Sequence, residues 1–156
     1  MVAAGAAGIN FEDQMVGSKT LYSIEDQCRR IKAVREVADQ SSIPLFINAR
    51  TDLFLKTDPR GHSEKHMKEA LVRASAYAES GASGFFAPGL IDGNYIERLC
   101  NHSPLPVNIL VKSGAPATRQ LVKMGVARIS YGPGPYRQMI STLKEQGREA
   151  LLQKQI

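Results

Sequence analysis

Two short apolar stretches of this chain each run into charged side chains. Residues 9–11 lead into Glu12, and residues 45–49 lead into Arg50. In parallel α/β folds the catalytic side chains gather at the carboxyl ends of the strands, so we expect Glu12 and Arg50 to lie beside each other. A carboxylate offers the oxygen ligands that hard cations prefer, and a guanidinium binds carboxylates through two parallel hydrogen bonds. The pair is our candidate for the chemical centre, with a surface acid and a plain ion pair as the alternatives.

Three neighbouring side chains are expected to support this pair. Asn48 lies two residues before Arg50, so both face the same side of their strand, and we expect Asn48 to support Arg50. Asp13 follows Glu12 directly and points the opposite way, which favours a structural salt bridge. Asp52 is expected to orient the loop after the second strand. An ion pair of Arg50 with Glu12 or Asp52 is compatible with a functional role.

Other polar residues give weaker signals. Asn108 lies within an apolar run, where it either faces a cavity as a hydrogen-bond donor or serves as a structural amide of the core. The spacing of the three histidines, His62, His66 and His102, fits no metal site, and we interpret them as residues of loops and helix surfaces.

Short apolar runs and helical patterns alternate along the whole chain. This alternation predicts an α/β fold in which a parallel sheet is covered by helices. We find no strand that alternates cleanly between polar and apolar residues, which favours strands buried on both faces. The expected strands are residues 9–11, 45–49, 84–87, 107–110 and 127–131, and the expected helices are 23–40, 63–80, 94–100, 115–124 and 136–153. In the last helix an apolar stripe is expected to face inward: Met139, Ile140, Leu143, Ala150 and Leu151.

Length and composition describe a single domain over residues 1–156. Hydrophobic residues make up 43% and charged residues 22%, which is typical of a globular protein with a sizeable core. The net charge of +5 comes from basic residues that form no run, so we expect no nucleic-acid partner. No apolar stretch is long enough to span a membrane. Cys28 and Cys100 lack metal-ligand spacing and suit free thiols in the reducing cytoplasm.

Four motifs resemble one enzyme family. They are Gly8-Ile-Asn-Phe-Glu-Asp-Gln14, Asn48-Ala-Arg-Thr-Asp52, Gly81-Ala-Ser-Gly-Phe-Phe-Ala-Pro-Gly89 and Pro106-Val-Asn-Ile-Leu110. Their order and spacing are similar to those of the isocitrate lyase/phosphoenolpyruvate mutase superfamily, and the resemblance covers essentially the whole chain. It implies a (β/α)8 TIM barrel that uses Mg²⁺ to hold α-keto acids and that breaks or makes C–C or P–C bonds beside an enolate.

Five residues are candidates for the functional site, and the resemblance implies roles for Glu12, Arg50 and Lys19. Glu12 matches the glutamate that holds Mg²⁺ through water, and Arg50 matches the arginine that grips the substrate carboxylate or stabilises the developing enolate. Asn48 and Asn108 are candidates for further contacts with the substrate. Lys19 lies in the stretch that matches the gating loop and either neutralises a substrate anion or is a solvated loop lysine. That stretch lacks the Lys-Lys-Cys-Gly-His motif of the isocitrate and methylisocitrate lyases and the Asn of the mutases.

The match begins at the fourth strand of the family's barrel. Such barrels take about 250 residues, so roughly 90 residues have no counterpart here. In the family that part carries a Ser-Gly substrate loop and the Asp ligands of Mg²⁺. We therefore expect a partial barrel of about five β/α units, produced by truncation or by a lost gene start.

Two functional hypotheses follow. The first is a Mg²⁺-dependent lyase or mutase that acts on a small α-keto or 2-hydroxy acid through a pyruvate enolate, impaired in the truncated chain. Oxaloacetate decarboxylation, phosphonopyruvate hydrolysis and a carboxyphosphonate-type transfer all stay open. The second is a non-catalytic half barrel that pairs with another chain, because an open barrel leaves two sheet edges unpaired. The resemblance also implies a homo-oligomer.

Overall fold

The computed structural model describes residues 4–18 and 20–153 of the chain. It contains a five-stranded sheet whose strands follow one another in sequence order and all run parallel. Consecutive parallel strands that alternate with helices form the wall of a (β/α)8 barrel. The predicted α/β fold and partial barrel are therefore confirmed. The strands are β1 (Gly8–Glu12), β2 (Phe46–Arg50), β3 (Gly84–Phe86), β4 (Val107–Leu110) and β5 (Arg128–Ser130).

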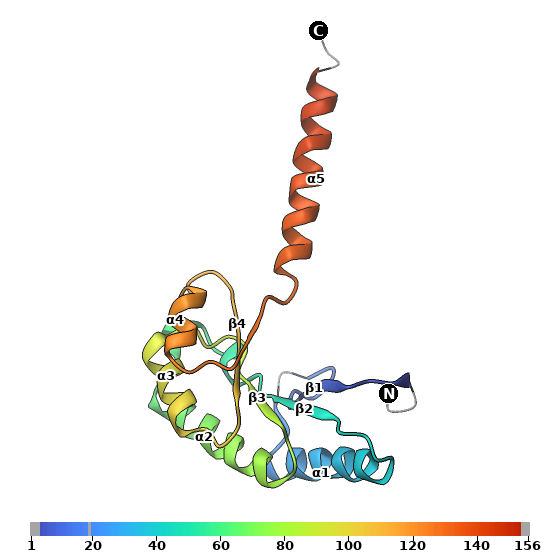
Figure 1. Ribbon diagram of the computed structural model, residues 1–156. Helices are drawn as coiled ribbons and strands as arrows, with labels where there is room; N and C mark the ends of the chain where they lie inside the picture. Colours follow the sequence, from blue (N-terminus) through green and yellow to red (C-terminus); the bar gives the residue numbers. More distant parts are fainter. Residues whose placement is uncertain (1–3, 19, 154–156) are drawn as a thin grey trace.

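Helices α1 to α4 lie along one face of this sheet (Figure 1). Ser23 caps α1, because its side chain accepts a hydrogen bond from the main-chain N–H of Asp26. Ser63 precedes α2 without such a bond, and its Oγ lies 3.0 Å from His66 Nδ1 instead. The helices are α1 (Ile24–Gln40), α2 (Glu64–Glu79), α3 (Gly93–His102), α4 (Thr118–Lys123) and α5 (Gly134–Gln153), and two short 3₁₀ turns cover Leu53–Leu55 and Pro59–Gly61.

The two faces of the sheet differ in polarity. Alternate strand positions point toward the helices and join one buried apolar core, which includes Ile47, Ala49, Phe85, Val107 and Ile109. The intervening positions include Phe46, Phe86 and Leu110 but carry mostly polar side chains: Asn10, Glu12, Asn48, Arg50, Asn108, Arg128 and Ser130. The expectation of strands buried on both faces holds for β3 and for most of β2 and β4, whereas β1 and β5 are largely accessible. The second face is the inner face of a barrel wall and carries no helix layer, which leaves room for its polar side chains.

The backbone register places the candidate residues in one row across the sheet. Glu12 is paired with Arg50, Arg50 with Phe86, Phe86 with Asn108, and Asn108 with Arg128. Paired positions of a parallel ladder direct their side chains to the same face. The sheet therefore brings the ends of β1 and β2 together on its inner face, as predicted from the two charged strand ends.

Helix α5 projects away from the sheet as a single rod (Figure 1). The expectation that its apolar stripe faces inward was wrong: Met139 is 57% exposed, Leu143 64% and Leu151 71%. The chain leaves β5 through a turn in which Gly132 has a φ of +52°, and this turn directs α5 away from the layer of α1 to α4. None of the described helices, α5 included, is long and apolar enough to cross a membrane.

Candidate functional site

Arg50 is the centre of a polar cluster at the carboxyl ends of β1 and β2. Its Nε donates a hydrogen bond of 2.6 Å to Asp52 Oδ1, and its Nη2 donates one of 3.0 Å to Asp52 Oδ2. Its Nη1 lies 3.2 Å from Glu12 Oε2. The sequence analysis considered an ion pair with either acid, and the structure contains both. Asp52 occupies one edge of the guanidinium and Glu12 pairs with Nη1, which leaves one further hydrogen on each of Nη1 and Nη2 for another acceptor.

The two carboxylates beside Arg50 differ in exposure. The side chain of Asp52 is 4% exposed, whereas that of Glu12 is 40% exposed. Burial opposes the charge of Arg50, but the hydrogen bonds and charge of Asp52, together with the charge of Glu12, outweigh it and raise the pKa of Arg50. Arg50 therefore stays cationic, Asp52 is its fixed partner, and Glu12 is the carboxylate that remains accessible.

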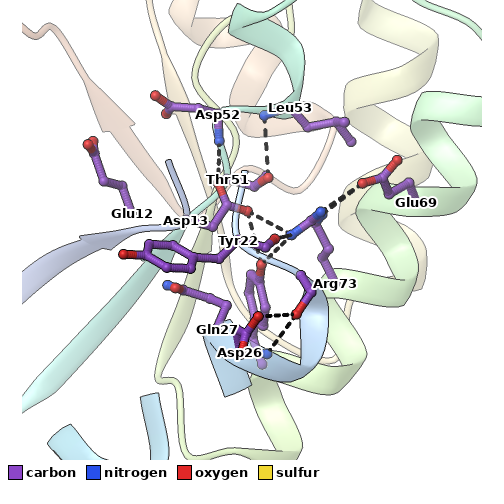
Figure 2. Close-up of polar contacts among 12 residues, drawn as sticks. Glu12, Asp13, Tyr22, Asp26, Gln27, Thr51, Asp52, Leu53, Glu69 and Arg73 are labelled. Carbon is purple, nitrogen blue, oxygen red and sulfur yellow. Dashed lines mark hydrogen bonds and ion pairs between the residues drawn. The ribbon is translucent and has the colours of Figure 1, made fainter. Parts of the chain in front are cut away.

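Asp13 is completely buried on the helix side of β1, and Figure 2 shows Glu12 pointing away from it. Its Oδ1 accepts a hydrogen bond of 3.0 Å from the main-chain N–H of Asp52. Its Oδ2 accepts one of 3.1 Å from Arg73 Nη1 and one of 2.9 Å from the Tyr77 hydroxyl. The structural salt bridge predicted for Asp13 is confirmed, and its partner is an arginine of α2.

Arg73 and Tyr77 lie four residues apart on the buried face of α2. The Tyr77 hydroxyl accepts a hydrogen bond of 2.9 Å from Arg73 Nη1, while Nε and Nη2 of Arg73 bind Glu69 Oε1 at 3.0 and 2.8 Å. Burial raises the pKa of Tyr77, and the charge of Asp13 adds to this effect, so the phenol stays protonated as a donor. Sequence reasoning singled out neither residue, because their spacing of four indicates a shared helix face but not a contact with Asp13.

The segment between β1 and α1 is anchored at its base by the same cluster. The main-chain N–H of Tyr22 donates a hydrogen bond of 2.7 Å to the carbonyl of Asp13. The carbonyl of Tyr22 accepts one of 3.3 Å from Arg73 Nη1. Lys19, the candidate for neutralising a substrate anion, belongs to this segment but lies outside the described residues. Its role therefore stays a prediction.

The two asparagine candidates lie on the inner face and are both buried. Asn48 Nδ2 donates a hydrogen bond of 2.7 Å to Asn10 Oδ1, which ties β2 to β1. Asn108 Oδ1 accepts one of 3.1 Å from the Ser130 hydroxyl. Asn108 Nδ2 has no hydrogen-bond partner among the described residues. The predicted contacts of both residues with substrate stay predictions.

A cavity of about 820 Å³ opens on the inner face at Arg50. Two further arginines, Arg128 of β5 and Arg137 of α5, line this cavity, and none of its described lining residues is acidic. Arg50 is already paired with Asp52 and Glu12, so the positive potential that attracts anions to this cavity comes mainly from Arg128 and Arg137. Sequence reasoning missed Arg128, although its alternation with Ile129 and Ser130 at the end of an expected strand was a usable signal.

This polar cluster provides only part of a metal-binding site. No group of three His, Cys, Asp or Glu side chains within residues 4–18 and 20–153 is placed to hold a metal. Asp13, Asp52 and Glu12 are all paired with arginines, but Asp13 and Asp52 are buried, so the accessible carboxylate at this edge of the described sheet is Glu12. A hard cation takes carboxylate oxygens and keeps several waters. Glu12 fits such a cation as one ligand, and the remaining ligands must come from other groups.

Comparison with known proteins decides the family. The sequence profile described as phosphoenolpyruvate phosphomutase matches residues 1–151. The chain belongs to this family. A candidate phosphonomutase from Burkholderia cenocepacia J2315 shares 41% of residues and a TM-score of 0.92, over 96% of this chain and 60% of that one. A 2,3-dimethylmalate lyase of the PEP mutase/isocitrate lyase superfamily shares the fold, with a TM-score of 0.80 at 19% identity.

The phosphomutase-family chain also resembles curated enzymes over part of their length. The oxaloacetate decarboxylase of Pseudomonas entomophila is 28% identical over 142 residues, which are 85% of this chain and 45% of that enzyme. The isocitrate lyase of Escherichia coli K12 is 35% identical over 60 residues, which are 33% of this chain and 14% of that enzyme. These relatives confirm the superfamily predicted from the motifs. The chain spans about half the length of the oxaloacetate decarboxylases it matches.

Proposed function

We propose that this protein is a Mg²⁺-dependent lyase or mutase that acts on a small α-keto or 2-hydroxy acid. It cleaves a C–C or P–C bond and leaves the bonding electrons in a pyruvate enolate. The observation that carries this proposal is Arg50, whose charge is secured by the buried Asp52 and which lines a cavity with two other arginines. Membership of the phosphomutase family and the oxaloacetate decarboxylases among the relatives support the substrate class.

Arg50 binds the substrate carboxylate in this mechanism. It uses Nη1 and Nη2, because Asp52 holds the Nε edge of the guanidinium. When the bond breaks, negative charge moves onto the keto oxygen, and the same guanidinium stabilises it. The two hydrogen bonds from Arg50 to Asp52, here called the fork, form before the substrate binds. The guanidinium of Arg50 therefore needs no reorganisation as the negative charge develops.

Glu12 is the proposed metal ligand, directly or through water. Its side chain is 40% exposed, and Arg50 pairs with one of its two oxygens, Oε2. When bound, Mg²⁺ acts as a Lewis acid toward the enolate oxygen. The other ligands in this proposal are water, substrate oxygens and groups that the described residues do not supply.

Three further side chains complete the proposed site. Asn108 donates a hydrogen bond to the substrate through Nδ2, which has no partner among the described residues. Asn48 contacts the substrate from the same face and holds β2 against β1. Lys19 neutralises part of the substrate charge from the loop between β1 and α1.

A non-catalytic half barrel that pairs with another chain is the second candidate, and α5 is the observation that favours it. Met139, Leu143 and Leu151 leave an apolar stripe of α5 exposed, and contact with a second copy would bury it. The edges of β1 and β5 have no neighbouring strand in the described sheet. We therefore propose a homo-oligomer, which is compatible with either function.

The remaining proposals concern partners and location. A small α-keto acid and further copies of this chain are the proposed partners, and nucleic acid is not one of them. Cys28 and Cys100 are free thiols, which supports the reducing environment of the cytoplasm.

Thermal unfolding with Mg²⁺ and oxalate tests the proposed enzyme, because oxalate imitates the planar pyruvate enolate. We expect the two together to raise Tm more than either alone, since a ligand that binds the native state stabilises it by about 2.7 kcal/mol at 100 times its dissociation constant. Glu12→Gln should abolish the metal-dependent part of the shift. Glu97→Gln, at an exposed site on α3, is the matched control. Cooperative unfolding without any shift would favour the non-catalytic half barrel.

A further inference from the structure

We propose that three buried side chains, Asp13, Arg73 and Tyr77, are positioning residues for Arg50. These three residues, here called the Asp13 clamp, lie on the helix side of the sheet, whereas Arg50 lines the cavity on the inner face. The clamp therefore acts through the strand ends and does not touch the substrate. The inference rests on the proposed function of Arg50 as the group that binds the substrate anion.

The carboxylate of Asp13 takes the place of a main-chain acceptor at the end of the sheet. The N–H of Asp13 donates a hydrogen bond of 3.0 Å to the carbonyl of Arg50, so the next bond of a regular parallel ladder would run from Asp52 N–H to the carbonyl of Asp13. That carbonyl accepts the N–H of Tyr22 at 2.7 Å instead. Asp13 Oδ1 accepts the Asp52 N–H at 3.0 Å. The side chain thus extends the ladder by one bond and holds the main chain of Asp52.

The position of Asp52 in turn determines the position of Arg50. Asp13 holds the main chain of Asp52, the carboxylate of Asp52 holds Arg50, and Arg50 pairs with Glu12. The ring closes because Glu12 and Asp13 are consecutive residues of the same strand end. A displacement of Asp13 therefore moves the fork on Arg50, and a misplacement of 1 Å in a catalytic site costs on the order of 100-fold in rate.

Arg73 and Tyr77 compensate for the loss of solvent around the buried carboxylate of Asp13. A charge without solvent needs an opposite charge and hydrogen bonds to its remaining lone pairs. Arg73 supplies the charge at 3.1 Å, and Tyr77 supplies a neutral donor at 2.9 Å. Arg73 also binds Glu69 through Nε and Nη2, but Glu69 is not among the hydrogen-bond partners described for Asp13. Tyr77 contacts both Arg73 and Asp13, whereas Glu69 contacts Arg73. Variants of these two residues can therefore distinguish an effect on the position of Arg50 from a general loss of stability.

The test compares Tyr77→Phe with Glu69→Gln. Glu69→Gln removes the charge of one partner of Arg73. Tyr77→Phe removes another partner of Arg73 and also a donor to Asp13, while it keeps the ring that packs near Phe85. We expect both variants to unfold at a lower temperature than the wild type. Only Tyr77→Phe should also weaken oxalate binding, by about tenfold at a temperature where all proteins are folded.

A second readout needs no ligand. The Nε–H of Arg50 gives an NMR signal that the Arg50→Lys variant assigns, and this N–H is the one bonded to Asp52. We expect Tyr77→Phe to shift or broaden that signal and Glu69→Gln to leave it in place. Asp13→Asn should have a larger effect in the same direction, and Tyr77→Phe decides the matter if Asp13→Asn fails to fold.

The results separate the two proposals. An unchanged Arg50 signal in folded Tyr77→Phe, or equal changes in both variants, overturns the Asp13 clamp whatever the affinity for oxalate. A wild-type protein that does not bind oxalate, combined with an Arg50 signal that moves only in Tyr77→Phe, overturns the proposed function and leaves the clamp standing.

Discussion

Arg50 and Asp52 are two residues apart, and their side chains form a two-point fork with distances of 2.6 Å from Nε to Oδ1 and 3.0 Å from Nη2 to Oδ2. The carboxylate half of this fork is almost completely buried, while the guanidinium half lines the cavity. The cation is therefore presented to the inner face of the sheet in one fixed orientation. This fixed orientation distinguishes Arg50 from a solvated surface arginine.

Arg50→Lys tests whether the fork, and not the charge alone, binds the anion. The lysine keeps the charge but cannot bind Asp52 and a substrate carboxylate through two planar edges. We expect the dissociation constant for oxalate, measured by calorimetry, to rise by about tenfold or more. Arg119→Lys, at an exposed site on α4, is the matched control and should bind oxalate like the wild type. Equal affinity in both variants would contradict a role for the fork.

Ser23→Ala tests the cap of α1. The Ser23 side chain accepts the main-chain N–H of Asp26 at 3.0 Å, and loss of such a cap costs about 1 kcal/mol. Urea denaturation should therefore show a lower free energy of unfolding. Ser63→Ala is the control, because Ser63 precedes α2 without a side-chain capping bond and should cost less. Equal losses at the two serines would show that the cap adds nothing.

Cys100 gives the protein a pH dependence on the alkaline side. Burial, with a smaller effect from the charge of Glu97, raises the pKa of the Cys100 thiol from 9.0 to about 11. The folded protein therefore holds this proton more tightly than the unfolded chain. The resulting stability is complete below pH 9 and is lost as the pH rises from 9 toward about 11.

Thermal unfolding across this pH range checks the effect of Cys100. Relative to its own Tm at neutral pH, Cys100→Ala should lose less stability than the wild type between pH 9 and about 11. Both proteins should behave in parallel below pH 9, where the thiol is protonated in the folded and the unfolded chain alike. Parallel curves over the whole range would contradict the raised pKa.

Leu143→Gln tests whether the exposed stripe of α5 mediates self-association. Leu143 is 64% exposed in the single chain, and its complete burial would contribute about 1.5–3 kcal/mol. We expect sedimentation velocity to show an oligomer for the wild type and a dissociation constant at least about tenfold higher for the variant. Lys144→Gln, at the next exposed position of α5, is the control. A monomeric wild type at micromolar concentration would contradict this assembly.

The amino-acid sequence by itself determined the α/β class and the approximate place of every strand. Those features depend on local patterns: short apolar runs such as residues 107–110, and caps such as Ser23. The positions of Glu12 and Arg50 at strand ends were predicted from equally local patterns. A parallel sheet places consecutive strand ends side by side, so the meeting of these two residues needed no knowledge of packing.

Only the tertiary structure decided which charges are buried and with whom they pair. Arg73 lies 60 residues after Asp13, and nothing in the local pattern of α2 indicates that its guanidinium reaches the end of β1. The exposure of α5 is a second example, because its apolar stripe has the same helical spacing as the buried stripe of α2. Pairing and burial are set by contacts between distant segments, whereas periodicity shows only which side of an element is apolar.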